Sequence, residues 1–237
     1  MQFTDHISHE FSAELEDIKS EVLAMGGLVE EQLSGAVRAM VEGDTDRATK
    51  VAQSDYQVNA MEVRIDEQCS SILARRQPAA SDLRLVLSVI KTITDLERIG
   101  DEAERVARMA EFMAGESLDA GLLTEIEHMG QLAGHMLNGA LDAFARQDAD
   151  AALELTKYDK KVDRKYESIM RQLITFMAQD PRSIPMALKL LWAARSIERV
   201  GDRSQNICEY VIYLVKGRDV RHTNLSQHLA SLKENAD

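Results

Sequence analysis

The stretches TDLERIGDEAERV (residues 94–106) and RSIERVGDRSQNI (residues 195–207) decide the fold of this chain. They align without a gap at a separation of 101 residues, the distance from Glu97 to Glu198 (198 minus 97). Within each stretch, small or apolar residues recur every three or four positions, which is the spacing of an amphipathic helix. The chain therefore contains one helix twice, and the similarity extends outward from it.

The segments that precede this helix are also duplicated. GDTDRATKVAQSDYQVN, from Gly43, aligns with QDADAALELTKYDKKVD, from Gln147, at a separation of 104 residues (147 minus 43). At the same separation, Met25, Val29, Leu33, Ala36 and Ala39 align with Met129, Ala133, Leu137, Ala140 and Ala143. The change from 104 to 101 predicts a connection three residues shorter in the second copy, near Pro181 and Pro185.

Each copy is expected to form three helices. From Leu15 to Ala36 apolar residues recur by threes and fours, and Gly43-Asp44 interrupts the pattern. The helices predicted after this first one span about 44–75, 81–113, 119–146, 148–178 and 183–217. Because the connections are short, neighbouring helices must run antiparallel.

We therefore expect an all-α fold in which two antiparallel three-helix bundles pack about a pseudo-twofold axis. Residues 1–115 form the first repeat and residues 116–217 the second, and residues 218–237 are a polar tail. Gly26-Gly27 lies inside the first helix, where we expect a close helix contact rather than a ligand cradle. Trp192 falls on an apolar stretch of the last helix, and we expect it to pack.

The composition and the charge of the chain exclude several classes of function. Hydrophobic residues make up 45% of the chain, which is enough for a substantial core. Cys69 and Cys208 are interpreted as buried or unreactive thiols. The formal net charge of −12 opposes binding to nucleic acid or to an anionic lipid surface. No run approaches the roughly 20 apolar residues of a membrane span, and the N-terminal sequence lacks signal-peptide features. We expect a cytoplasmic protein that does not insert into membranes.

Acidic residues stand where the helical pattern would place apolar ones. Val86, Ile90, Ile93, Glu97 and Asp101 form one stripe, and Ala187, Leu191, Ala194, Glu198 and Asp202 form its equivalent. Each stripe ends in two carboxylates at i,i+4, which repel one another, and burial strengthens the repulsion. Either the nearby Arg98, Arg105, Arg199 and Arg203 or a bound cation must compensate for this charge.

The preceding helix of each copy adds further oxygen ligands. Asp55 and Asn59 are an i,i+4 pair in the first copy, and Asp159 and Asp163 are their equivalents in the second. In an antiparallel hairpin, these pairs face the acidic ends of the stripes. Four oxygen ligands in each copy would suit hard cations such as magnesium, manganese, calcium or oxidised iron. The alternative interpretation is that the acids lie on a solvated face or pair with the arginines.

The duplicated pattern resembles the PhoU family. LERIGDEAERV and IERVGDRSQNI carry the resemblance, with AMGGLVEEQL and HMGQLAGHML in the first helix of each copy, and it extends from about His6 to Lys216. Members of the PhoU family are cytoplasmic negative regulators of the phosphate regulon. The resemblance implies that the chain connects PstB, the ATPase subunit of the phosphate ABC transporter, with the sensor histidine kinase PhoR.

The resemblance also implies a homodimer and metal sites. The implied metal ligands are Asp55, Asn59, Glu97 and Asp101 in the first copy and Asp159, Asp163, Glu198 and Asp202 in the second. The metal would be magnesium, manganese, iron or zinc. Asn59 keeps an oxygen ligand but lacks a charge, so we expect the second site to bind more tightly. Contacts with the membrane would be made through partners only.

Two other functions compete with this one. A di-iron carboxylate oxidase or metal-storage bundle needs a Glu-x-x-His motif on each of two helices. The chain has Glu125 and His128, but the equivalent positions are Glu21 and Ala24, so the second histidine is missing. No nucleophilic arrangement or phosphate loop is present, and we expect no enzymatic activity. The other alternative is a metal-free scaffold whose acids dock basic partners.

Overall fold

A computed structural model describes residues 2–115 and 119–220 of the chain, and in those ranges all regular secondary structure is helical. The elements are α1 (Gln2–Glu42), α2 (Thr45–Arg76), α3 (Ala80–Phe112), α4 (Ala120–Arg146), α5 (Ala149–Thr156), α6 (Asp159–Gln179), the 3₁₀ turn η1 (Pro181–Ser183) and α7 (Ile184–Lys216). The all-α prediction is confirmed. The predicted polar tail lies outside the described residues beyond residue 220.

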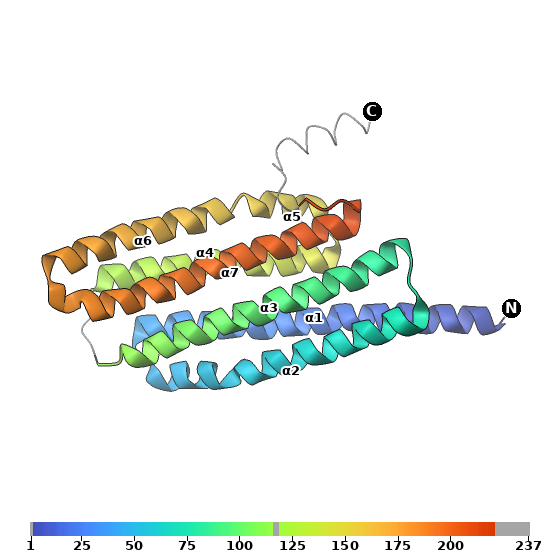
Figure 1. The fold of residues 1–237 in the computed structure, drawn as a ribbon, viewed down its shortest axis with the longest axis horizontal. Coiled ribbons are helices and arrows are strands. Elements are labelled where there is room, and N and C mark those ends of the chain that lie inside the picture. The colour runs from blue at the N-terminus through green and yellow to red at the C-terminus, as the bar shows by residue number, and fades with distance from the viewer. Residues whose placement is uncertain (1, 116–118, 221–237) are drawn as a thin grey trace, which may run out of the picture.

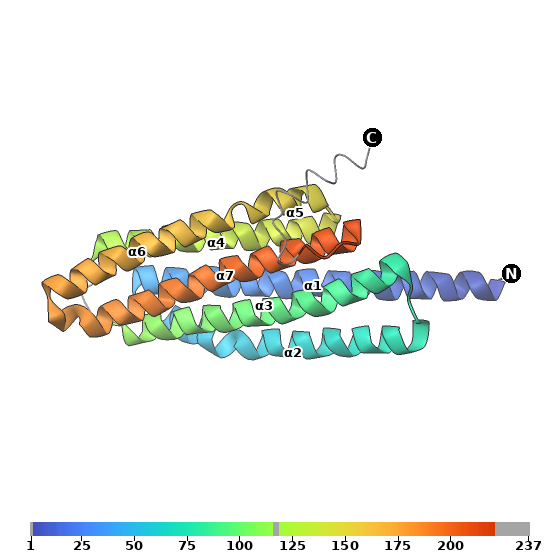
Figure 2. The same cartoon turned by 45° about the horizontal axis from the view of Figure 1, so that its top comes forward.

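The helices form two antiparallel bundles that lie side by side (Figures 1 and 2). The first bundle contains α1, α2 and α3, and the second contains α4, α5, α6 and α7. The bundles pack on each other through α3 against α7 and α1 against α4, so equivalent helices of the two copies meet. This arrangement confirms the tandem repeat and its pseudo-twofold relationship.

The two copies begin their second helices in the same way. The Asp44 carboxylate accepts a hydrogen bond from the Arg47 backbone N–H at 2.9 Å, and the Asp148 carboxylate accepts one from that of Ala151 at 2.9 Å. An aspartate at this position satisfies a backbone donor that the helix leaves free. The residues just before these caps, Gly43 and Gln147, are both left-handed, with φ of 68° and 53°.

The helix predicted over residues 148–178 is interrupted, which corrects the sequence interpretation. α5 ends at Thr156 and α6 begins at Asp159, with Lys157 and Tyr158 between them. The N–H groups of Lys157 and Tyr158 bond three residues back, at 3.3 and 2.9 Å, which tightens the chain. The Thr156 hydroxyl also donates to the Leu153 carbonyl at 2.8 Å, and such local bonds compete with the regular helical pattern.

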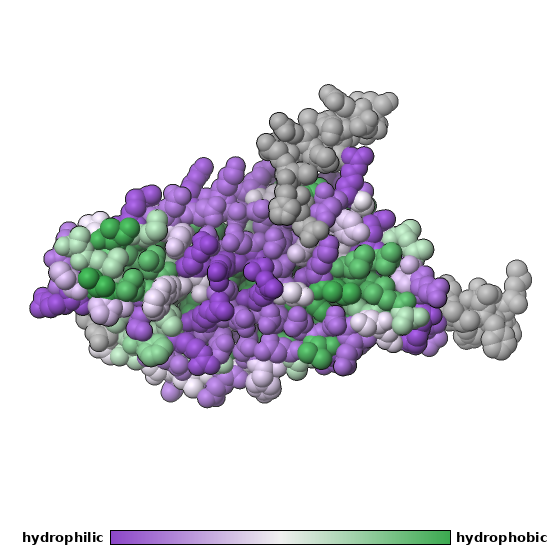
Figure 3. Space-filling model, viewed as in Figure 1, coloured by the Kyte–Doolittle hydropathy of each residue, from purple (hydrophilic) through white to green (hydrophobic). Residues whose placement is uncertain are grey.

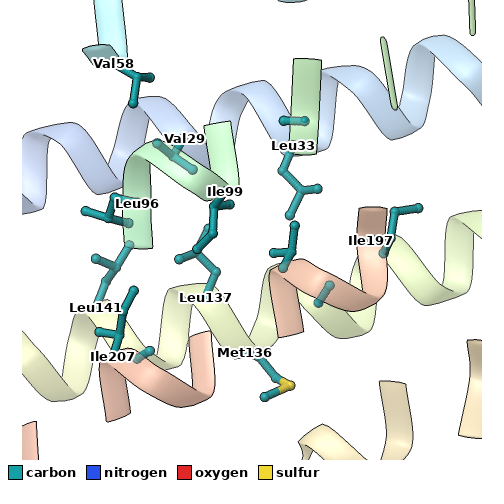
Figure 4. Close-up of a cluster of buried hydrophobic side chains, with 14 of the residues drawn as sticks. Val29, Leu33, Val58, Leu96, Ile99, Met136, Leu137, Leu141, Ile197 and Ile207 are labelled. Carbon is teal, nitrogen blue, oxygen red and sulfur yellow. The ribbon is translucent and has the colours of Figure 1, made fainter. Parts of the chain in front are cut away.

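The core lies where α1, α3, α4 and α7 meet, and Figure 4 shows Leu33, Ile99, Leu137 and Ile197 converging there. All ten residues that aligned the first helices of the two copies are buried. Neighbouring helices come into close contact at glycines. A Cβ added to Gly26 would lie 2.6 Å from Leu141, whereas one added to Gly27 would meet nothing within 4 Å. The predicted close helix contact is therefore made by Gly26 alone.

A buried polar network joins the two bundles between α3 and α7. Asp95 is 3% exposed, and its carboxylate accepts hydrogen bonds from Arg203 at 3.0 Å and from the Tyr210 hydroxyl at 2.8 Å. About two turns further along α3, Glu102 accepts a hydrogen bond from Arg199 of α7 at 3.1 Å. Buried charges are tolerated when they are paired in this way. The network fixes how the two copies sit against each other.

The surface of the α3 and α7 face is divided by polarity. Figure 3 shows a hydrophilic centre, with hydrophobic residues gathered toward the two ends. Trp192 is 56% exposed and Phe112 65% exposed, so the expectation that Trp192 packs in the interior is wrong. The ammonium of Lys189 lies 4.0 Å from the centre of the Phe112 ring.

None of the described helices has both the length and the apolar character that a membrane crossing requires.

Candidate metal sites

The first cluster of carboxylates forms between α2 and α3. Oxygens of Asp55, Asp101 and Glu104 all lie within 4.8 Å of one another. Asp55 comes from α2, whereas Asp101 and Glu104 come from adjacent turns of α3. The antiparallel hairpin therefore brings together Asp55 and Asp101, as the spacing predicted, and adds Glu104.

Two acceptor atoms at the first cluster have no hydrogen-bond partner among the described residues. Asn59 Nδ2 donates to Asp55 Oδ2 at 2.8 Å, so the amide is held against the carboxylate. Asp55 Oδ1 and Asn59 Oδ1 are both buried and make no hydrogen bond within the described chain. Buried acceptors without a donor cost free energy. A cation or its bound water would satisfy them.

The second cluster forms in the equivalent place, between α6 and α7. Oxygens of Asp159, Asp163 and Asp202 lie within 4.8 Å of one another. Asp159 is the first residue of α6 and directly follows the interruption after α5. Its Oδ1 atom is buried without a hydrogen-bond partner among the described residues. Three of the four predicted residues of the second copy therefore converge.

The predicted glutamates lie beside the clusters rather than within them. Glu97 and Glu198 are absent from both groups of converging oxygens in the described chain. Glu198 is 8% exposed, and its carboxylate pairs with Arg195 through Oε1 while Oε2 is buried without a partner. Burial, and then the charges of Asp101, Glu62 and Asp55, raise the pKa of Glu97. The negative charges of the adjacent clusters therefore raise the pKa of both glutamates.

Burial and mutual repulsion raise the pKa of cluster residues in both copies. In the first copy, burial is the largest cause for Asp55, whose pKa is raised also by Asp101 and Glu104. In the second, burial followed by Asp163 and Asp202 raises the pKa of Asp159 to about 6. Burial followed by Asp202 raises the pKa of Glu198 to about 7. These carboxylates are held close together without enough compensating charge.

The arginines proposed as compensating charges mostly pair elsewhere. Arg199 and Arg105 donate to Glu102 at 3.1 and 2.7 Å, and Arg203 donates to Asp95 at 3.0 Å. Within the described residues, no ion pair joins an arginine to Asp101 or Asp202. The converging aspartates of α3 and α7 are therefore not held in ion pairs, although the charges of Arg195, Arg203 and Arg199 oppose the rise in the pKa of Asp202.

The two clusters differ at positions that sequence reasoning missed. Glu104 belongs to the first cluster and pairs with Arg108 at 2.5 Å. Their equivalents 101 residues later are Gln205 and Glu209, and the charge of Glu209 raises the pKa of Asp159. The spacing of Glu104, one turn beyond Asp101, was the signal that could have identified it. The second cluster lacks a counterpart of Arg108, whereas Arg195, which pairs with Glu198 beside the second cluster, has Thr94 as its equivalent in the first copy.

The residues that suggested a di-iron oxidase do not form a metal site. Glu125 pairs with Lys165 at 2.7 Å, and His128 is exposed. Neither belongs to a group of converging metal ligands in the described part of the chain. Among the described residues, the groups of converging potential ligands are those around the repeated aspartates.

Comparison with known proteins agrees with the duplicated fold. The PhoU domain matches the chain twice, over residues 22–110 and 126–211, so the class of protein is a duplicated PhoU-domain bundle. The phosphate-specific transport system accessory protein PhoU homolog of Pseudomonas putida is 52% identical over 98% of this chain and 91% of its own length. PhoU of Escherichia coli is 51% identical over 94% of this chain and 92% of its own. The chain belongs to the PhoU family.

Solved structures of PhoU proteins share the fold. The crystal structure of PhoU from Pseudomonas aeruginosa superposes with a TM-score of 0.85 at 53% identity, covering 88% of this chain and all of that one (100%). The phosphate transport system regulatory protein PhoU from Streptococcus pneumoniae gives 0.82 at 31% identity, covering 89% and 99%. The resemblance expected from the sequence is confirmed.

Proposed function

We propose that this protein is an accessory regulator of phosphate uptake that acts through protein contacts and not as an enzyme. The observation that carries the proposal is its similarity, over 98% of the chain, to a phosphate-specific transport system accessory protein. Its partners would be PstB, the transporter ATPase subunit, and the cytoplasmic part of the PhoR kinase. By contacting both, the protein would make the kinase state depend on the transporter state. Repression of the phosphate regulon would follow.

The proposal extends to cation binding at the two acidic clusters. Asp55, Asp101 and Glu104 with Asn59 would hold one ion, and Asp159, Asp163 and Asp202 would hold another, with Glu97 and Glu198 beside them. All the available donors are oxygens, which suits hard cations such as magnesium, manganese, calcium or iron better than zinc. A bound cation would neutralise the acids and fix α2 against α3 and α6 against α7.

The second cluster is proposed to bind more tightly. It offers three converging aspartates, whereas Arg108 neutralises part of the first cluster by pairing with Glu104. Asn59 stands in the first copy at the position of Asp163. Greater negative charge favours cation binding when the ligand geometry is comparable.

Partner binding is tested by pull-down of the purified protein against PstB and the cytoplasmic part of PhoR. Capture of both supports the coupling role, and a homodimer is expected from the molar mass in light scattering. In cells, deletion of the protein is expected to derepress alkaline phosphatase at high phosphate. Failure to bind either partner, together with unchanged repression in the deletion strain, would contradict the proposal.

Metal binding is tested by elemental analysis and calorimetry with Mn²⁺ on the wild type and on the Asp163→Asn/Asp202→Asn variant. We expect the variant to lose the tighter of two binding events. Glu167→Gln is the matched control, because Glu167 lies on α6 and pairs with Arg171 at 3.6 Å outside the cluster. If the acid variant loses partner binding while neither protein binds metal, the acids form a metal-free docking surface instead.

A further inference from the structure

A polar residue from a third helix lies beside Asp55 of the first cluster and has no polar counterpart in the second copy. Gln32 of α1 is 4% exposed, and its Oε1 atom is buried without a hydrogen-bond partner in the described chain. The residue 104 positions later is Met136 (136 minus 32), which is fully buried. Figure 4 shows Met136 pointing away from Val29 and Leu33 of α1.

Two hydrogen bonds fix the orientation of the Gln32 amide. Gln32 Nε2 donates to Ser54 Oγ at 3.0 Å, and the Ser54 hydroxyl donates its own proton to the Val51 carbonyl at 2.8 Å. With that proton committed, Ser54 can only accept from Gln32. Rotating the amide by 180° would place two acceptors against each other. The Gln32 oxygen therefore faces away from Ser54.

The Gln32 oxygen and the unpartnered oxygen of Asp55 both lie against Gly100 of α3. A Cβ added to Gly100 would lie 3.3 Å from Asp55 Oδ1 and 3.4 Å from Gln32 Oε1. The missing side chain at Gly100 thus lets α3 approach closely to two buried acceptors. At Gly201, the equivalent position, the three atoms nearest to an added Cβ belong to Val162 and Asp159 of α6, with Val162 Cγ1 at 3.4 Å and Asp159 Oδ1 at 3.5 Å, and none belongs to α4. A cation or a bound water that reaches both acceptors would satisfy them.

We infer that Gln32 selects the cation of the first cluster by supplying a neutral amide oxygen, either to the ion or to its bound water. This inference rests on the proposed cation binding. With Gln32 and Asn59, the first cluster has amide oxygens as well as three carboxylates. Calcium takes six to eight oxygen ligands, carbonyl oxygens included, whereas magnesium retains several waters and needs few protein ligands. The first cluster therefore favours calcium relative to magnesium, and the second cluster lacks this bias.

The test uses the residue that the second copy carries at this position. Gln32→Met is made in the Asp163→Asn/Asp202→Asn background, so that only the first cluster binds, and Ca²⁺ and Mg²⁺ affinities are measured by calorimetry. We expect the Ca²⁺ affinity to fall about tenfold, as for other residues that orient or supplement metal ligands. The Mg²⁺ affinity should fall less than about threefold, because magnesium keeps its waters. Ser54→Ala, which removes only the orienting bond, should lower Ca²⁺ affinity by a smaller factor.

Thermal unfolding in a chelator measures whether Gln32→Met changes the packing of the metal-free protein, separately from its effect on cation affinity. Methionine is buried at the equivalent position, so Gln32→Met should fold and keep the stability of the metal-free protein. An unchanged Ca²⁺ to Mg²⁺ affinity ratio in a folded variant overturns the inference while leaving cation binding intact. Absence of binding of either ion to the background protein overturns both the inference and the proposed cation site.

Discussion

Gly130 of α4 packs directly against Val37 of α1, and a Cβ added to Gly130 would lie 2.8 Å from both Val37 methyl carbons. The equivalent contact is made by Gly26 of α1 against Leu141 of α4. These two residues stand 104 positions from Gly130 and Val37 respectively (130 minus 26 and 141 minus 37). The contact between α1 and α4 therefore obeys the pseudo-twofold symmetry. It depends on two glycines, each of which accepts a branched side chain of the opposite helix.

Substituting Gly130 tests how tightly this interface is packed. Gly130→Ala should destabilise the protein, because overpacking costs about 1–3 kcal/mol and valine has little rotamer freedom to move aside. That cost exceeds the roughly 1 kcal/mol that alanine gains over glycine in a helix interior. Urea unfolding measures the difference. Gly27→Ala, which meets nothing within 4 Å, is the control and should be neutral or stabilising.

The buried network between the bundles predicts the effect of removing one hydroxyl. Tyr210→Phe leaves one lone pair of Asp95 without the donor that now lies at 2.8 Å. A hydrogen bond to a charged group is worth about 1.5–3 kcal/mol, and we expect a loss of that order in the free energy of unfolding. Tyr213→Phe is the control, since no hydrogen bond of the Tyr213 hydroxyl occurs among the described residues. Equal losses for the two variants would contradict the assignment.

The raised pKa values in the second cluster predict how stability changes with pH in the metal-free protein. Folding raises the pKa of Asp159 to about 6 and that of Glu198 to about 7, from 3.8 and 4.5. The folded state then binds protons more tightly than the unfolded state, so this stabilisation is complete below about pH 4 and is lost as the pH rises through 6 and 7. The melting temperature in a chelator should fall over that window.

Two further measurements check the origin of this pH dependence. Asp159→Asn/Glu198→Gln should show a flatter curve, because neither replacement titrates. Saturating divalent cation should restore the melting temperature near pH 8, since the ion binds the ionised carboxylates. A variant whose curve is as steep as that of the wild type would assign the pH dependence to other groups.

Gln147 offers a simple route to higher stability. It adopts φ of 53° at the end of α4, where its repeat equivalent Gly43 adopts 68°. A left-handed conformation costs a non-glycine residue about 1 kcal/mol, so Gln147→Gly should raise the stability by about 0.5–1 kcal/mol. Gln131→Gly, in the interior of α4, should instead lower it by a similar amount. Differential scanning calorimetry would detect both shifts, and a destabilised Gln147→Gly would contradict the argument.

The helices and their duplication could be predicted because both follow from local spacing. Apolar residues at threes and fours define buried faces, and two fixed separations align the copies. The interruption before Asp159 was not predictable in this way, because the apolar pattern continues across Lys157 and Tyr158. It arises from hydrogen bonds of the backbone and of Thr156, which side-chain periodicity does not report.

The candidate sites were predicted in part. The aspartates at equivalent spacings converge because an antiparallel hairpin places i,i+4 pairs opposite one another. Glu104 was missed because its participation depends on the rotation of α3 relative to α2. The arginine partners were missed because Asp95 and Arg203 meet only once the two bundles dock. Gln32 could not be identified either, since it approaches the cluster from α1, a helix outside the hairpin.

The pairing of Asp95 with Arg203 records how the two copies have diverged since duplication. The equivalent of Arg203 in the first copy is Glu102, and the equivalent of Asp95 in the second copy is Ser196 (203 minus 102 and 196 minus 95, both 101). Two identical first copies would therefore place Asp95 against a glutamate, and two identical second copies would leave the arginine facing a serine. The pairing therefore needs one half of each kind. If the interface first joined two identical units, it now joins two units that differ.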